Sequence, residues 1–230
     1  MPQHPADGAA AQSLRLPAGV VFAHCRHGAA GGYVTLPPAL DRAVPRRQLD
    51  YIAGRRAAAR AVQQLRGQPG VIGRDADGAP VWPRGLVGAI SHSGGCAVAL
   101  AGSGAAHAGL GVDLEQVIPC PSEIAPLVLD PAEARCLAAL PLPPEQALTV
   151  VFSAKESLFK ALYPTVRRRF GFDAARLLDI GPGHGVLRLS APLPPWRGGQ
   201  CLGFRWTLWQ GQVLTAIAVP PVPGIRDSAA

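Results

Sequence analysis

Three short apolar runs separated by glycine-rich turns constrain the fold of this 230-residue chain more than any other feature. The runs are Leu86–Ile90, Cys96–Ala101 and Ala108–Leu114, and the stretches between them contain HSGG and GSGAAH. Apolar segments of this length, bounded by Gly and Ser, are typical of β-strands joined by turns. The middle of the chain is therefore predicted to form a small sheet.

Helical patterns lie on both sides of this sheet in the sequence. Apolar residues recur at helical spacing over Arg46–Arg66, where Gly67 is a stop signal, and over Pro144–Tyr163, where Pro164 is the stop. A shorter helix is expected after Asp130, which would be its N-cap. Further strands are predicted at Gly19–Ala23, Ala175–Ile180 and Val186–Leu189, followed by a hairpin around Gly211 with Leu202, Phe204, Trp206 and Leu208 on one face.

These elements predict an α+β fold built from two similar halves with pseudo-twofold symmetry. Each half would be a helix followed by an antiparallel sheet. The expected division is residues 1–108 for the first half, 109–222 for the second and 223–230 for a loose tail.

The composition is that of a globular protein, with 48% apolar and 16% charged residues. Its five cysteines are odd in number and form no CxxC pair, which favours a reducing compartment over a disulfide frame or structural zinc. No apolar stretch reaches membrane-spanning length and no signal-peptide pattern opens the chain, so a cytoplasmic location is expected. The net charge of +7 suggests an anionic partner: a nucleotide, a nucleic acid or an acidic protein.

Two acids close the third apolar run, in the sequence GVDLE. Residues two apart in a strand point to the same face, so Asp113 and Glu115 would project together while Leu114 turns to the core. Mg²⁺ suits such a pair because it binds one or two carboxylates and completes its shell with water and phosphate oxygens. The alternative is a solvated strand end at which both acids are simply hydrated.

The helix that contains FSAKESLFKALYP carries the two lysines of the chain, Lys155 and Lys160. Lys155 falls near the middle of its apolar face, while Glu156 and Lys160 lie along the edge. A buried charge is costly unless it is paired or meets a ligand. A capping box formed by Ser153 and Glu156 does not explain the pattern, because the apolar period continues upstream. The other alternative is a Glu156–Lys160 pair on the helix surface, with Lys155 reaching toward water.

Ser91 and His92 end the first apolar run. Two glycines, Gly94 and Gly95, follow after Ser93. A hydroxyl and an imidazole at a strand exit can bind phosphate, although a packed histidine is also common. The helix over 46–66 adds Arg47 and Arg55, which would bind phosphate or form part of a solvated basic face.

Five of these segments follow one another in a fixed order over residues 45–172. They are RRQLDYIAGR, GAPVWPRGLVGAISHS, GVDLE, FSAKESLFKALYP and then Gly171-Phe172. The ordered set resembles the 4′-phosphopantetheinyl transferases, specifically those like enterobactin synthase component D and, more distantly, the surfactin type. The resemblance implies two similar α+β halves with the active site between them.

The resemblance also implies an activity. The enzyme would move 4′-phosphopantetheine from coenzyme A onto a serine of an acyl, peptidyl or aryl carrier protein and release adenosine 3′,5′-bisphosphate, with Mg²⁺ as cofactor. Asp113, Glu115 and Glu156 would hold the metal. Glu156 would also deprotonate the serine, and Lys160 would assist the leaving group. Coenzyme A phosphates would be bound by Arg47, Arg55, Ser91, His92, Lys155 and Lys160, and by Arg74 in place of a lysine that many surfactin-type members carry at the position of Ala79.

The expected macromolecular partners are acidic carrier domains of fatty-acid, polyketide or non-ribosomal peptide synthases, which the arginines at 167–169 would contact. Neither nucleic acid nor membrane is an expected partner, and a monomer is expected because both halves of the site lie in one chain. Two other classes share part of the pattern: a Mg²⁺-dependent nuclease or other phosphotransfer enzyme, and a non-catalytic carrier- or nucleotide-binding protein. The nuclease reading lacks an E-x-K strand pattern and a stripe of aromatic and basic residues for stacking on bases. The binding-protein reading does not require a lysine on an apolar helix face.

Overall fold

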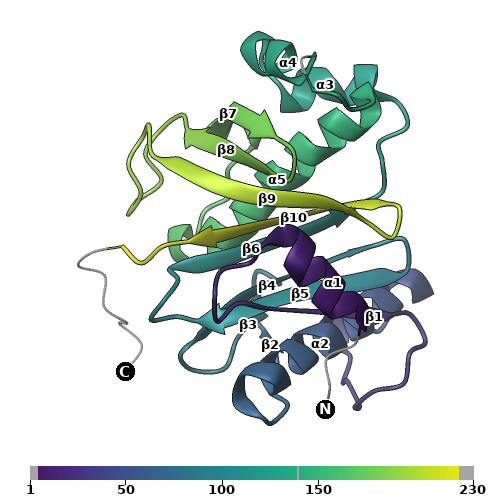
Figure 1. Cartoon of the computed structure of the whole chain (residues 1–230). Helices are drawn as coiled ribbons and strands as arrows, with labels where there is room; N and C mark the ends of the chain where they lie inside the picture. Colours follow the sequence, from purple (N-terminus) through teal and green to yellow (C-terminus); the bar gives the residue numbers. More distant parts are fainter. Residues whose placement is uncertain (1–4, 139, 223–230) are drawn as a thin grey trace.

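Two antiparallel sheets, each packed against a long helix, form the frame of the molecule (Figure 1). The computed structural model describes residues 5–138 and 140–222. The smaller sheet has the order β1–β5–β4, with β1 (Val21–Arg26), β4 (Leu86–Ser93) and β5 (Cys96–Ser103). The larger has the order β6–β10–β9–β8–β7, with β6 (Gly109–Glu115), β7 (Ala175–Gly181), β8 (His184–Leu189), β9 (Cys201–Trp209) and β10 (Gln212–Val219). The predicted α+β class is confirmed.

The helices cover opposite faces of this frame. They are α1 (Pro5–Leu14), α2 (Pro45–Arg66), α3 (Pro121–Val128), α4 (Pro131–Ala138) and α5 (Pro144–Val166). Figure 1 shows α1 in front of the sheets and α5 behind the larger one. Short 3₁₀ turns, η1 (Pro38–Leu40) and η2 (Phe172–Ala174), and a two-stranded hairpin of β2 (Gly73–Arg74) and β3 (Pro80–Val81) complete the fold.

Helix α2 packs on the smaller sheet through small residues. Alanines dominate its buried face, with Ala53, Ala57 and Ala58 in one apolar cluster with β5 residues. Its end is the predicted one, since Gly67 adopts a left-handed conformation (φ 76°) and its N–H bonds to the carbonyl of Gln63. Small side chains on this face let the helix axis lie close to the sheet.

Helix α5 is longer than the sequence predicts, because it continues through Pro164 to Val166. Pro164 lacks its own N–H donor, but the helix closes beyond it, since the N–H of the C-cap residue Arg167 bonds to the Tyr163 carbonyl. The prediction that the helix ends at Tyr163 is therefore wrong by one turn. The N-cap predicted at Asp130 is confirmed, since its Oδ1 accepts hydrogen bonds from the N–H groups of Ala132 and Glu133.

Helix α1 was missed by the sequence analysis. Its alanine-rich sequence has a weakly defined apolar face, and its position depends on Asp7, whose Oδ1 accepts a hydrogen bond from the backbone N–H of His24 on β1. The strand expected at Gly19–Ala23 instead begins at Val21, because Gly19 (φ 79°) lies in the preceding turn.

The C-terminal hairpin forms around Gly211 as predicted, with Gln210 and Gly211 at φ 52° and 77°. Leu202, Phe204 and Trp206 are buried against α5, whereas Leu208 is 48% exposed at the end of the same strand. The opposite side of the strand is also partly covered, since Trp209 packs edge-on against Phe22.

The two halves share part of their core. One apolar cluster joins Leu14, Phe22 and Leu100 of the first half to Leu114 and Leu214 of the second. The division expected after residue 108 therefore falls where β6 begins without separating two independent cores. The tail expected at 223–230 lies outside the described residues.

Candidate functional site

Two glycines of β6 bring α5 into direct backbone contact with the acidic pair. Gly109 and Gly111 face α5, and a Cβ on either would overlap the carbonyl oxygen of Ala161 or of Ser157. Strand alternation places Asp113 and Glu115 on this same face, while Leu114 is fully buried on the other, as the sequence predicts. The two glycines are thus what lets α5 reach the carboxylates, and the pattern G-x-G-x-D-x-E carried this information in the sequence.

Asp113 is the centre of the site and is 1% exposed. Its Oδ1 accepts hydrogen bonds from Ser91 Oγ at 2.8 Å and from Lys160 Nζ at 2.5 Å. Lys160 Nζ also donates to Ser91 Oγ at 2.8 Å, so β4, β6 and α5 meet at one point. Asp113 Oδ2 is buried and has no partner among the described residues. One oxygen of the carboxylate is therefore still available to a ligand.

Glu115 and Glu156 lie near Asp113 and Lys160, so three carboxyl groups share one ammonium group. Burial, then Asp113 and, to a smaller extent, Glu156 raise the pKa of Glu115 to about 7, although Lys160 opposes the shift. Burial and Asp113 likewise raise the pKa of Glu156 against the effect of Lys160. Among residues 5–138 and 140–222 no three His, Cys, Asp or Glu side chains already converge as a metal-binding group. The metal set Asp113, Glu115 and Glu156 stays a prediction.

His92 is held between Arg47 and an acid that the sequence analysis did not consider, Asp50. Arg47 Nη1 donates to His92 Nε2 at 3.1 Å, and His92 Nδ1 lies 3.6 Å from Asp50 Oδ2. The other oxygen of Asp50 accepts a hydrogen bond from His27 Nε2 at 2.8 Å. Burial lowers the pKa of His92; Asp50 opposes this effect, and Arg47 and Lys160 add to it. These contacts favour a neutral imidazole with its proton on Nδ1, facing Asp50.

Arg55 lies two turns along α2 from Arg47 and is 9% exposed. Its guanidinium carbon stands 4.6 Å from the centre of the Tyr51 ring, a cation–π contact. The Nε atom is buried and has no hydrogen-bond partner within the described part of the chain. A buried guanidinium with an unused donor is suited to an anionic ligand.

Comparison with known proteins assigns the chain to a family. Residues 36–102 match the 4′-phosphopantetheinyl transferase N-terminal domain, and residues 109–213 match the 4′-phosphopantetheinyl transferase superfamily. The chain is 37% identical over 194 residues to 4′-phosphopantetheinyl transferase Svp of Streptomyces mobaraensis, covering 82% of this chain and 79% of that protein. The chain belongs to the 4′-phosphopantetheinyl transferase superfamily.

Other relatives of this transferase are similar over most of their length. Enterobactin synthase component D of Salmonella typhi is 32% identical over 190 residues, covering 80% of this chain and 78% of that protein. Among solved structures, the holo-[acyl-carrier-protein] synthase of Thermotoga maritima gives a partial likeness, with a TM-score of 0.40 and 17% identity over 50% of this chain and 64% of that one. The two family matches divide the site, since Arg47, Arg55, Ser91 and His92 fall in the first and Asp113, Glu115, Glu156 and Lys160 in the second.

The structure does not bring Lys155 into the group around Asp113. Its ammonium is 2.7 Å from Glu133 Oε1 and donates to the carbonyl of Val128 at 2.7 Å, and the side chain is 3% exposed. Lys155 was expected to bind coenzyme A phosphates, but in this transferase it joins α5 to the α3–α4 region. The carboxylate of Glu133 compensates the buried positive charge of Lys155. The sequence analysis did not consider Glu133 as its partner.

Arg74 is also separate from the other predicted site residues. It is exposed on β2, and its guanidinium lies over Gly78 of its own hairpin. The next residue, Asp75, accepts a hydrogen bond from Arg167 Nη1 at 2.7 Å, which attaches the hairpin to the end of α5.

No helix among the described residues is long and apolar enough to cross a membrane.

Proposed function

We propose that this transferase moves the 4′-phosphopantetheine group of coenzyme A onto a serine of an apo carrier protein and releases adenosine 3′,5′-bisphosphate. The observation that carries the proposal is the buried Asp113, whose Oδ1 accepts hydrogen bonds from Lys160 and Ser91 and whose Oδ2 has no partner among the described residues. Phosphoryl transfer depends mainly on positioning and on neutralising charge, and this arrangement supplies both.

We also propose that the site takes Mg²⁺. The fit rests on Asp113 Oδ2, which lacks a partner among the described residues, and on Glu115 and Glu156. Burial, and then the neighbouring Asp113, raise the pKa of both glutamates although Lys160 opposes the shift. Carboxylate oxygens, waters and phosphate oxygens are the ligands that Mg²⁺ prefers. Bound there, the metal would neutralise charge on the pyrophosphate.

The residues of the chain have separate parts in the reaction. Arg47, Arg55 and His92 line the α2 side and would hold coenzyme A phosphates, with Ser91 beside them. The carrier serine oxygen forms a bond to the phosphorus of the phosphopantetheine, and the bond from that phosphorus to the nucleotide phosphate oxygen breaks. Glu156 would accept the serine proton, directly or through water, and its raised pKa brings it nearer to the range of an effective base. Lys160 would stabilise the charge that develops on the departing phosphate.

The acceptor is proposed to be an acidic carrier domain of fatty-acid, polyketide or non-ribosomal peptide synthesis. The net charge of +7 favours an acidic partner, and Arg168 and Arg169 are exposed just beyond α5. Arg167, in contrast, already pairs with Asp75.

The test is a transfer assay with coenzyme A, Mg²⁺ and several apo carrier proteins, read by mass spectrometry of the carrier. We expect one phosphopantetheine adduct per carrier, dependent on both coenzyme A and Mg²⁺. A carrier in which the acceptor serine is replaced by alanine is the control. No adduct on any carrier would contradict the proposal, and nicking of DNA without coenzyme A would favour a nuclease instead.

A further inference from the structure

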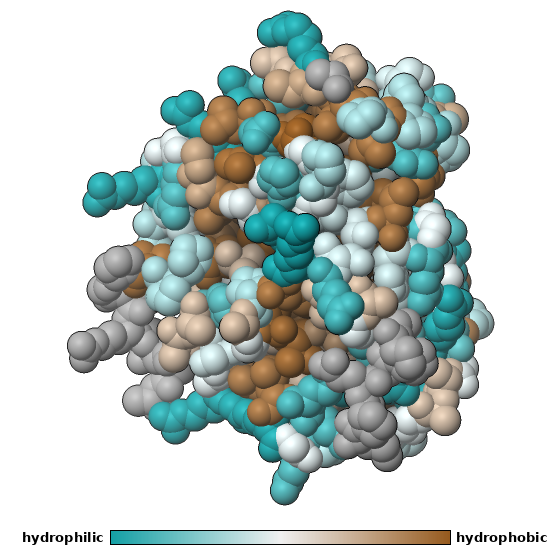
Figure 2. Space-filling view, viewed as in Figure 1, coloured by the Kyte–Doolittle hydropathy of each residue, from teal (hydrophilic) through white to brown (hydrophobic). Residues whose placement is uncertain are grey.

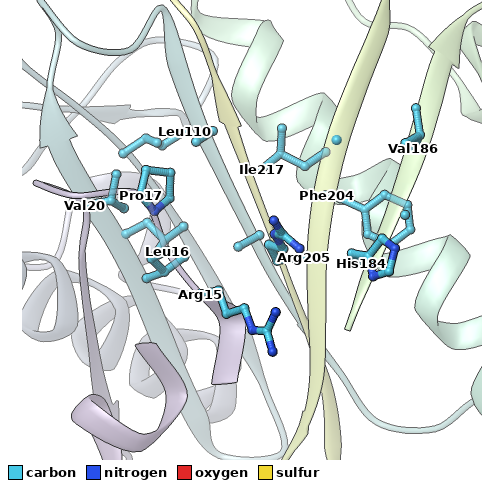
Figure 3. Close-up of a pocket in the computed structure, with 15 residues that line it drawn as sticks. Arg15, Leu16, Pro17, Val20, Leu110, His184, Val186, Phe204, Arg205 and Ile217 are labelled. Carbon is cyan, nitrogen blue, oxygen red and sulfur yellow. The ribbon is translucent and has the colours of Figure 1, made fainter. Parts of the chain in front are cut away.

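A cavity lies on the face of the larger sheet away from α5 and from Asp113, and Figure 3 shows residues that line it. Its volume is about 370 Å³. The floor comes from β8, β9 and β10, and one wall comes from the segment after α1, with Leu16, Pro17 and Val20. Because Ile217 packs toward α5 while Ala216 belongs to the opposite cluster, the two faces of β10 separate this cavity from the transferase site.

The cavity exists because the strands carry small residues there. Gly203, Ala216 and Ala218 lie on the floor. A Cβ on Gly203 would have only the carbonyl oxygen of Gly185 within 4 Å, at 3.9 Å, so this part of the floor is open. On the side of the molecule seen in Figure 2, apolar side chains reach the surface between hydrophilic ones. The floor therefore offers apolar area to a ligand.

Strand register divides the floor into a basic row and an apolar row. In the first row His184 pairs with Arg205, which pairs with Ala216. The apolar row lies two residues further along each strand. There Val186 of β8 pairs with Gly203 of β9, and Ala218 of β10 pairs with Leu110 of β6. A ligand that lies along the strands would therefore meet positive charge at one end and hydrocarbon at the other.

The basic end has no counter-charge. Figure 3 shows Arg15 extending from the segment after α1 on the same side of the cavity as Arg205, with His184 beside Arg205. No described lining residue is acidic, and the guanidinium groups of Arg15 and Arg205 make no hydrogen bond or ion pair with another described residue. Neighbouring guanidinium groups repel each other, and an anion between them removes that repulsion.

We propose that this cavity binds a single-chain amphipathic carboxylate, of the class of a medium-chain fatty acid. The carboxylate would lie between Arg15 and Arg205, since a guanidinium can donate two parallel hydrogen bonds to it. The alkyl chain would cover Gly203 and Ala218 and contact Leu16 and Leu110. The volume is at the low end of small-molecule sites, which favours one short chain over a two-chain lipid.

The test is isothermal titration of the full chain with decanoate below its micelle concentration. We expect saturable binding at one site, and at least tenfold weaker binding of decanol and of decyltrimethylammonium. Equal affinity for decanol would overturn the assignment of a charged head site. Tenfold tighter binding of decyl phosphate would overturn the carboxylate assignment.

Two variants test the cavity residues. Arg205→Gln removes the head contact and Ala218→Leu fills the floor from a half-buried position, and each should weaken decanoate binding at least tenfold. Arg188→Gln changes an exposed charge on β8 outside the cavity and should leave affinity unchanged. All three should unfold at the temperature of the parent and retain full phosphopantetheine transfer. Unchanged decanoate affinity in both cavity variants would overturn the proposal. Loss of transfer in a cavity variant that unfolds at the parent temperature would overturn the separation of this cavity from the transferase site.

Discussion

At the scale of single residues, Asp113 is the side chain on which the proposed transferase site depends. It accepts bonds from two other elements and has one free oxygen, so replacement by an amide removes charge with little change of shape. We expect Asp113→Asn to reduce phosphopantetheine transfer by about 100-fold or more, since ligands and charged groups at such sites commonly have effects of this size.

The measurement is the initial rate of carrier modification, with thermal unfolding as the check on folding. Asp179→Asn, at an exposed position on β7, is the matched control and should keep the parent rate. A fully active Asp113→Asn enzyme would remove Asp113 from the proposed metal site.

Asp50 has a positioning role at the same scale. It is 8% exposed and contacts both His27 and His92, so it fixes the ring that faces Arg47. We expect Asp50→Asn to weaken coenzyme A binding about tenfold while most of the rate at saturating coenzyme A is retained. Titration of coenzyme A and steady-state kinetics on the same preparation measure this split. Equal losses of rate and affinity would instead indicate general damage to the fold.

The cysteines give a prediction that does not depend on the activity. All five are free thiols; Cys25 and Cys96 are buried, and Cys120, Cys136 and Cys201 are exposed. Burial raises the pKa of Cys96 to about 11, so almost no thiolate forms there at pH 8, and burial also raises the pKa of Cys25. A colourimetric thiol reagent at pH 8 should therefore titrate three cysteines in the native protein and five after denaturation. Rapid reaction of all five without denaturant would contradict the buried positions.

At the scale of elements, the contact of α5 with β6 sets the geometry of the site. A methyl group on Gly111 would overlap the Ser157 carbonyl, so Gly111→Ala must push the helix away from the strand. We expect a loss of about 3 kcal/mol in the free energy of unfolding, the upper part of the range for overpacking, together with loss of transfer activity. Chemical denaturation measures the first and the carrier assay the second. Gly32→Ala is the control, because a Cβ built on Gly32 has no neighbouring atom within 4 Å. This variant should change neither the free energy of unfolding nor the transfer activity.

The α3–α4 region packs on α5 through an apolar cluster that includes Val128 and Leu137, and Glu133 adds a buried ion pair. Its carboxylate accepts bonds from Lys155 and from the backbone N–H groups of Asp130 and Leu177, and it is 2% exposed. We expect Lys155→Met to cost about 3–5 kcal/mol, because one partner of a buried ion pair is left without the other. Coenzyme A affinity measured on the folded variant at low temperature should match the parent. A stable variant with weakened coenzyme A binding would instead restore Lys155 to the phosphate site.

At the scale of the whole molecule, the shared apolar cluster makes the two halves one cooperative unit. Leu100 and Leu114 belong to different halves but to the same cluster, and β6 contributes to both faces of its sheet. We expect one thermal transition, with tryptophan fluorescence and far-ultraviolet circular dichroism giving the same midpoint. A fragment of residues 1–108 should not fold alone. Two separate transitions would show that the halves are independent.

The sequence was sufficient for much of the frame, because strands such as β5 and β10 are bounded by turn residues that act locally. The contact between Asp113 and Lys160 could be predicted only from the family resemblance. The two residues are 47 positions apart, so no local pattern joins them. The partner of Lys155 could not be predicted, because the docking of α4 decides which acid reaches it. Asp50 was missed for the same reason: on a helix rich in arginine, nothing local distinguishes it from a surface acid.

One consequence of the convergence at Asp113 concerns the order of events during synthesis. Ser91, Asp113 and Lys160 belong to three elements that leave the ribosome one after another, and α5 is the last of them. Until that helix has docked, the buried carboxylate has no ammonium beside it. The strand that completes the pairing of β6 is the final one, β10. A growing chain that has not yet made α5 and β10 therefore cannot assemble the group of Ser91, Asp113 and Lys160, and we expect transferase activity to appear only after both elements have docked.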